Sequence, residues 1–150
     1  MGTRADFYIG IGPSAEWIGS ISHDGDPERD PRAAVAATSE HLFRNAVGKI
    51  LSEHPGEPTR PDEGWPWPWP DSRTTDFAYA WCDDGVVRVS RFGYQWMPLD
   101  EYAAAGYPSG VYGIGRLTDA EVVDMTATRM TTDDLLAKSG LMFLKFRNGE

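Results

Sequence analysis

The sequence predicts a single α+β domain over residues 1–150, with an antiparallel sheet of about four or five strands packed by one long amphipathic helix and smaller C-terminal helices. Three observations predict this class. Two pairs of short alternating segments are each joined by a turn signal, at Gly12-Pro13-Ser14 and at Asp83-Asp84-Gly85. One long segment carries apolar residues at helical spacing. A chain of 150 residues with 41% hydrophobic content suits one core.

The first predicted hairpin pairs residues 7–11 with residues 17–21. A polar loop from His23 to Pro31 follows, in which Asp30 is expected to cap a helix and Pro31 to take its first position. Thr38-Ser39 is a point at which this helix could divide into two. Pro55-Gly56 ends it. Its apolar stripe consists of Leu42, Phe43, Ala46, Val47, Ile50 and Leu51.

Residues 54–72 form a proline-rich connection that holds half of the six tryptophans. Trp65, Trp67 and Trp69 alternate with prolines in what we call the Trp-Pro segment (residues 64–70). Proline fixes its own φ and pushes the preceding residue into extended geometry, so this segment is predicted to be stiff and extended. We expect it to cross the sheet as a packed strap, with at least one indole ring in the core.

The second predicted hairpin pairs residues 75–82 with residues 86–92 around Asp84-Gly85, because glycine relieves the positive φ of such a turn. Residues 93–116 are expected to form loops, with a short helix after Asp100. A capping-box pattern predicts a helix from Thr118. The remaining predictions are a helix from Thr131 to Gly140 and a last strand over residues 141–147.

The formal net charge of −9 argues against nucleic-acid binding through a basic patch. An acidic surface can instead occupy the nucleic-acid groove of a partner, although solubility alone also explains acidity. No apolar stretch approaches the length of a membrane span, and no secretory signal is visible, so we expect no membrane association. The single cysteine, Cys82, indicates a reducing compartment.

The best metal candidate is His23 with Asp24 and Asp26, since alternating oxygen ligands around a glycine can wrap a hard cation. The exit of a hairpin followed by a helix cap explains the same residues. We therefore assign no cofactor. No serine or histidine has the setting of a catalytic group, so no catalytic residue is assigned and a binding protein is favoured over an enzyme.

The candidate binding residues are aromatic. Arg73 follows the three tryptophans of the Trp-Pro segment and could stack on an indole ring, which gives either a recognition surface or an internal clamp. Trp65 and Trp67 could also join Tyr94 and Trp96 in an aromatic-lined pocket suited to a base or a sugar.

Three stretches of this chain resemble small, uncharacterised proteins of phages and prophages: residues 1–21, the Gly-Trp-Pro-Trp-Pro-Trp run at 64–69, and Asp-Ser-Arg-Thr-Thr-Asp-Phe-Ala-Tyr-Ala at 71–80. The resemblance covers roughly the first 92 residues. It implies a viral or mobile-element origin and action in the host cytoplasm, and it brings no known activity.

Together these observations predict a phage- or prophage-encoded accessory protein that binds a host bacterial protein and inhibits or redirects it. A defence protein or a nucleic-acid-handling protein is the expected target, bound by acidic mimicry. The alternative is a domain that binds a small molecule or nucleotide in an aromatic-lined pocket, with or without enzymatic activity. The sequence leaves the oligomeric state open.

Overall fold

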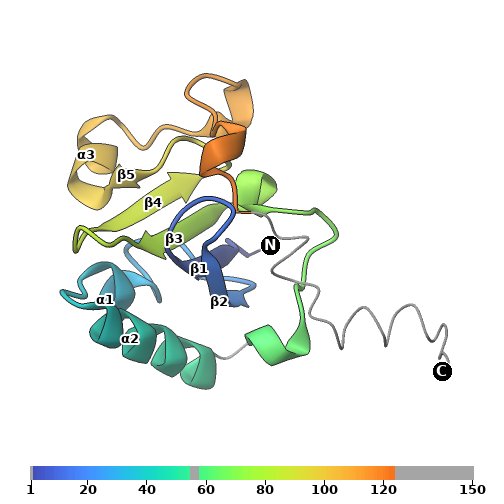
Figure 1. Cartoon of the computed structure of the whole chain (residues 1–150), viewed down its shortest axis with the longest axis vertical. Coiled ribbons are helices and arrows are strands. Elements are labelled where there is room, and N and C mark those ends of the chain that lie inside the picture. Colours follow the sequence, from blue (N-terminus) through green and yellow to red (C-terminus); the bar gives the residue numbers. More distant parts are fainter. Residues whose placement is uncertain (1, 55–57, 124–150) are drawn as a thin grey trace, which may run out of the picture.

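The computed structural model describes residues 2–54 and 58–123. One five-stranded sheet runs through it in the order β2-β1-β3-β4-β5, with helices α1 and α2 on one face (Figure 1). The α+β class predicted from the sequence is confirmed.

Strand pairing is mixed rather than purely antiparallel. β1 (Ala5–Ile9) forms the predicted hairpin with β2 (Glu16–Ile21), and β3 (Phe77–Trp81) forms the second with β4 (Val87–Arg91). β1 and β3, however, run parallel. After β2 the chain passes through two helices and a long connection before β3 begins, which gives it the crossover that a parallel pair needs. The antiparallel prediction is therefore wrong at this pair.

The predicted long helix divides at Thr38-Ser39, as the sequence allowed. α1 (Arg32–Val35) is a single turn, and α2 (Glu40–Glu53) is the long amphipathic helix. The Ser39 side chain caps α2 by accepting a hydrogen bond from the Leu42 amide at 3.1 Å. The side of α2 that faces the sheet buries Phe43, Val47, Ile50 and Leu51.

The stretch predicted as loops with a short helix after Asp100 contains that helix and, in addition, a short strand. Edge strand β5 (Met97–Pro98) pairs with β4, and α3 (Leu99–Ala104) follows it directly. The capping box at Thr118 is present, but it begins a 3-10 turn, Asp119–Glu121, rather than a longer helix. The helix and strand predicted beyond Thr131 lie outside the described residues.

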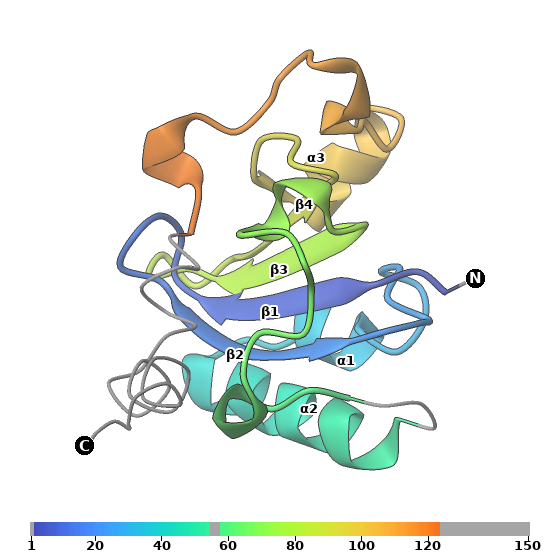
Figure 2. The same cartoon turned by 90° about the vertical axis from the view of Figure 1, so that its right-hand side faces the viewer.

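The core has two halves because both faces of the sheet are covered. On β3, Phe77, Tyr79 and Trp81 face the helices, whereas Ala78 and Ala80 face the opposite side. That opposite side is covered by the Trp-Pro segment, which Figure 2 shows crossing in front of β2 and β1. No helix among the described residues has the length and apolar composition that crossing a membrane requires.

The contrast between two neighbouring residues of α2 tests this packing. Phe43 is fully buried and Leu42 is 48% exposed. Phe43→Ala should lower the free energy of unfolding by about 3–5 kcal/mol, because it leaves a cavity against the sheet. The control Leu42→Ala should change it by about 0.5 kcal/mol or less. Urea denaturation measures both, and equal losses would contradict the orientation of α2.

Candidate functional site

The tryptophans of the Trp-Pro segment pack onto the sheet. Trp65 is 8% exposed and meets Trp17 edge to face, with ring centroids 5.3 Å apart. Trp67 and Trp69 are partly buried and stack on each other at 5.6 Å. The segment is therefore the packed strap expected from its prolines, with Trp65 in the core.

Every indole N–H of this segment is satisfied within the chain. Trp65 donates to the Trp69 carbonyl at 2.6 Å, and Trp69 donates to the Thr75 hydroxyl at 2.9 Å. Trp67 donates to the Asp6 carboxylate at 2.7 Å. These bonds turn the polar edges of the rings inward, which favours the clamp over a recognition surface.

The arginine of this clamp is Arg4 rather than Arg73. The Arg4 guanidinium lies 5.6 Å from the Trp67 ring centroid and 5.5 Å from that of Trp69. Arg73 instead pairs with Asp71 at 2.9 Å, which raises the pKa of the guanidinium through hydrogen bonding. Asp71 lies only two residues away and offers both carboxylate oxygens, so the local ion pair prevails over stacking on an indole.

Trp96 and Tyr94 lie in different parts of the structure. Trp96 packs against the same apolar cluster as the Trp-Pro segment, meets Tyr8 edge to face at 6.4 Å and donates to the Glu121 carbonyl at 3.1 Å. Tyr94 lines a surface groove described below, together with Tyr107. The predicted set of Trp65, Trp67, Tyr94 and Trp96 is thus split between core and surface.

A buried carboxyl that the sequence analysis missed lies beneath the Trp-Pro segment. Asp6 is fully buried in β1 and accepts hydrogen bonds from the hydroxyls of Ser20 and Ser72, each at 2.6 Å, besides the bond from Trp67. The Tyr8 hydroxyl bonds Ser72 in turn. Burial raises the pKa of Asp6, and the hydrogen bonds partly oppose that shift. The sign of this site in the sequence was an aspartate within an otherwise apolar strand.

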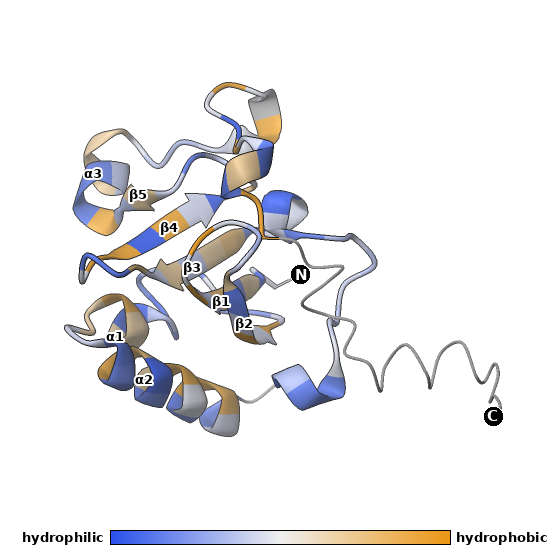
Figure 3. Ribbon diagram, in the orientation of Figure 1, coloured by the Kyte–Doolittle hydropathy of each residue, from blue (hydrophilic) through white to orange (hydrophobic). Residues whose placement is uncertain are grey.

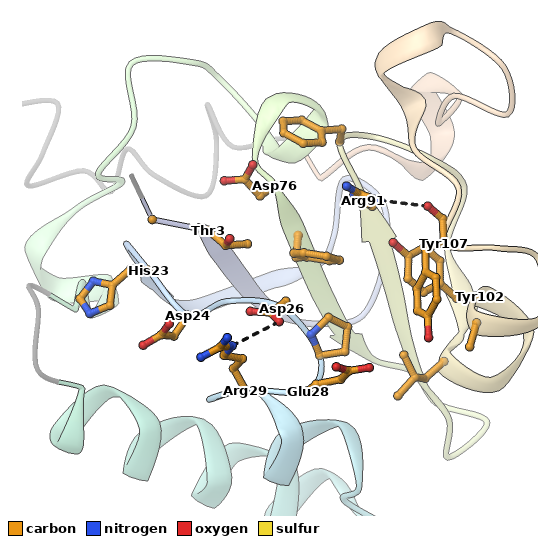
Figure 4. Close-up of a pocket in the computed structure, with 16 residues that line it drawn as sticks. Thr3, His23, Asp24, Asp26, Glu28, Arg29, Asp76, Arg91, Tyr102 and Tyr107 are labelled. Carbon is orange, nitrogen blue, oxygen red and sulfur yellow. Dashed lines mark hydrogen bonds and ion pairs between the residues drawn. The ribbon is translucent and has the colours of Figure 1, made fainter.

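A cavity with largely polar walls lies elsewhere, at the end of the sheet where β1 and β3 begin. It has a volume of about 900 Å³ and is lined by the chain before β1, the loop after β2, the ends of β3 and β4, and α3 (Figure 4). We call it the sheet-end pocket. Its polar lining residues are Thr3, His23, Asp24, Asp26, Glu28, Arg29, Asp76, Arg91, Tyr102 and Tyr107.

The loop after β2 is held in place from two sides. Gly25 donates to the Thr3 carbonyl at 2.9 Å and accepts from the Tyr79 hydroxyl at 2.6 Å. A Cβ on Gly25 would lie 2.7 Å from the Thr3 carbonyl oxygen, so only glycine fits here. On the other side is His54, which follows the last residue of α2, and its Nε2 atom lies 2.7 Å from the His23 carbonyl oxygen.

The metal candidates line this pocket without forming a metal centre. The His23 ring packs on the His54 ring at 4.2 Å, and Asp26 pairs with Arg29 at 3.7 Å. Within residues 2–54 and 58–123, no group of three or more His, Cys, Asp or Glu side chains has the geometry to hold a metal ion. Asp24 therefore lines the pocket as an acidic wall residue.

Backbone strain is concentrated at the sheet-end pocket. In the described part of the chain, three residues other than glycine have a positive φ: Asp24 at 59°, Phe92 at 48° and Tyr107 at 58°. All three line the pocket. Such conformations persist where the surroundings impose them, and they gather at ligand sites.

Arg91 and Tyr102 add polar groups to the same wall. The Arg91 guanidinium donates to the Tyr107 carbonyl at 3.1 Å. Tyr102 is 1% exposed, and its hydroxyl is the one buried side-chain polar atom in the described residues without a hydrogen-bond partner. Burial raises the pKa of Tyr102, and the charge of Arg91 opposes the shift. Neither residue stood out in the sequence, because the fold alone brings residues 91 and 102 together.

No protein family model, no curated protein and no solved structure matches this chain. Function must therefore be argued from the chemistry of the site.

The raised pKa of the buried Asp6 carboxyl predicts a pH dependence of stability that can be tested. Because its pKa is raised above the ordinary value of 3.8, the folded state holds this proton more tightly than the unfolded chain does. The contribution of Asp6 to stability is thus fully present at low pH and is lost as the pH rises through the folded-state pKa. The free energy of unfolding of the unmodified chain minus that of Asp6→Asn should fall over this range, measured by urea denaturation at several pH values.

Asp84 is the matched control. It is exposed and pairs with Arg88 at 2.7 Å, which lowers its pKa, so its contribution is lost as the pH falls. The free energy of unfolding of the unmodified chain minus that of Asp84→Asn should therefore rise with pH. A difference for Asp6→Asn that rises with pH would contradict the raised pKa.

Proposed function

We propose that this chain is a phage- or prophage-encoded accessory protein that binds a host bacterial protein in the host cytoplasm and inhibits or redirects it. The observation that carries the proposal is the segment after α3. There Tyr107 is 47% exposed, Val111 55% and Ile114 76%. Figure 3 shows orange, hydrophobic stretches in this part, at the top of the view.

These side chains share one groove rather than being scattered. Together with Arg91 and Tyr94 they line a depression of about 520 Å³ on the surface. Among the residues that the structure describes, Leu42 is the other large hydrophobic side chain that is mainly exposed, and it lies on α2. Apolar side chains gathered in this way are typical of a contact surface, and aromatic residues are typical anchors of one.

The negative net charge of the chain supports binding to a partner with a basic surface. A net charge of −9 attracts a positively charged surface and speeds the encounter at low salt. We propose a partner that places an apolar side chain in the groove and surrounds it with basic residues, as the nucleic-acid-binding face of a host protein would. The tryptophans at 65, 67 and 69 lie outside this surface, because they serve the internal clamp.

A second candidate function, binding of a small molecule, is supported by the sheet-end pocket. Its volume of about 900 Å³ is that of a small-molecule site, and the unpartnered Tyr102 hydroxyl lines it. This pocket is distinct from the tryptophan-lined one expected from the sequence.

Substitution of the most exposed apolar side chain tests the first function. Ile114→Glu places a charge in the groove and should abolish capture of the partner from bacterial lysate at physiological salt, without lowering the melting temperature. The measurement is mass spectrometry of proteins retained by the immobilised chain.

Leu42→Glu is the matched control, since it introduces the same charge at an exposed leucine outside the groove. It should retain the partner. If both variants capture the same proteins as the unmodified chain, this groove is not the contact surface.

A thermal-shift screen tests the second function. A ligand present at a hundredfold its dissociation constant adds about 2.7 kcal/mol of apparent stability. At least one small molecule in a panel of amino acids, nucleotides and sugar phosphates should raise the melting temperature. The absence of any shift across the panel would count against small-molecule binding.

A further inference from the structure

The two walls of the sheet-end pocket carry groups of opposite charge. Figure 4 shows the loop after β2 on one side, with Asp24, Asp26 and Arg29, and shows Arg91 with the two tyrosines on the other. The charges on these walls and their existing partners indicate what kind of ligand the pocket would take.

Arg91 has hydrogen-bond donors to spare. It donates to the Tyr107 carbonyl and its guanidinium carbon lies 5.9 Å from the Phe77 ring centroid, but no carboxylate in the described part of the chain pairs with it. The other arginine of the pocket, Arg29, pairs with Asp26. A guanidinium with five donors that is placed in this way is suited to a carboxylate.

The Tyr102 hydroxyl is the second polar group on this wall. It is buried in α3 beside the Arg91 side chain, and no group among the described residues accepts its hydrogen, which is costly for a folded chain. A ligand oxygen in the pocket would accept its hydrogen. Tyr102 and Arg91 would then both donate to the same anionic group.

The opposite wall calls for a positive charge. Asp26 forms an ion pair with Arg29, and Asp76 forms one with Arg4. Asp24 and Glu28, in contrast, form no ion pair with any described residue. The lining as a whole holds four carboxylates, at residues 24, 26, 28 and 76, and two guanidiniums, at residues 29 and 91. A simple anion would be repelled by the carboxylates, and a simple cation would leave Arg91 and Tyr102 unused.

We propose that the sheet-end pocket binds a zwitterionic small molecule of the amino-acid class. Its carboxylate binds Arg91 and the Tyr102 hydroxyl, and its ammonium group faces Asp24. Phe77, Phe92 and Tyr107 supply aromatic surface for an apolar body. The inference rests on the second candidate function and names its ligand. The left-handed backbone of Asp24, Phe92 and Tyr107 is consistent with a site whose wall residues are held in place.

Three matched compounds test the class of ligand by isothermal titration calorimetry on the full chain. L-Phenylalanine carries both charges, 3-phenylpropionate only the carboxylate, and 2-phenylethylamine only the ammonium group. L-Phenylalanine should bind, and each singly charged compound should bind at least about tenfold more weakly.

Substitutions test the assigned contacts with the same titration. Tyr102→Phe removes only the unpartnered hydroxyl, so it should weaken binding of L-phenylalanine several-fold while leaving the melting temperature equal or higher. Arg91→Gln and Asp24→Asn should weaken binding as well, and asparagine tolerates the left-handed backbone at position 24. Arg88→Gln, which removes an arginine of the same strand outside the pocket, should leave binding unchanged.

Four outcomes would overturn the inference. Equal binding of 3-phenylpropionate and L-phenylalanine would make the pocket an anion site, and unchanged affinity in Tyr102→Phe would remove the hydroxyl from it. If L-phenylalanine fails to bind while a nucleotide or sugar phosphate raises the melting temperature of the unmodified chain but not of Tyr102→Phe, the zwitterion class is wrong and small-molecule binding stands. If nothing in the panel binds, both fall.

Discussion

The buried carboxyl of Asp6 joins parts of the chain that are far apart in sequence. It accepts hydrogen bonds from Ser20 in β2, from Ser72 before β3 and from Trp67 in the Trp-Pro segment. A carboxyl this deep in an apolar core is tolerable only when its oxygens are satisfied, so the hairpin, the strap and the turn before β3 stabilise the fold only when they are present together. The sheet therefore depends on a connection that contains neither helix nor strand over residues 64–70.

That connection covers the face of the sheet opposite the helices, where a second layer of helices would otherwise pack. Its prolines hold the backbone extended, and the indole rings provide wide apolar area over the small side chains of Ala78 and Ala80. Because the indole N–H groups bond internally and Arg4 covers the outer rings, little of this aromatic surface is left for a ligand. The binding proposed above is therefore assigned to the sheet-end pocket and the surface groove, whose lining includes no residue of the Trp-Pro segment.

Local patterns in the sequence predicted most of the local structure, although the N-cap of α1 is Pro31 rather than Asp30 and no side chain caps it. The two hairpins, the division of the helix at Ser39 and the rigid strap all follow from turn chemistry, capping and proline geometry. The parallel pairing of β1 with β3 was missed because neighbours in a sheet that are distant in sequence leave no local signal. The same reason explains the choice of Arg73 over Arg4, and the absence of Arg91 and Tyr102 from the predicted site.

The sheet-end pocket and the surface groove share three residues, Arg91, Phe92 and Tyr107. Tyr107 is held with a positive φ, and its carbonyl accepts a hydrogen bond from Arg91. Whatever shifts these side chains on one side changes the shape and charge presented on the other. If both places bind as proposed and occupancy of one moves these shared side chains, the two binding events are coupled, and by reciprocity each alters the affinity of the other by the same factor.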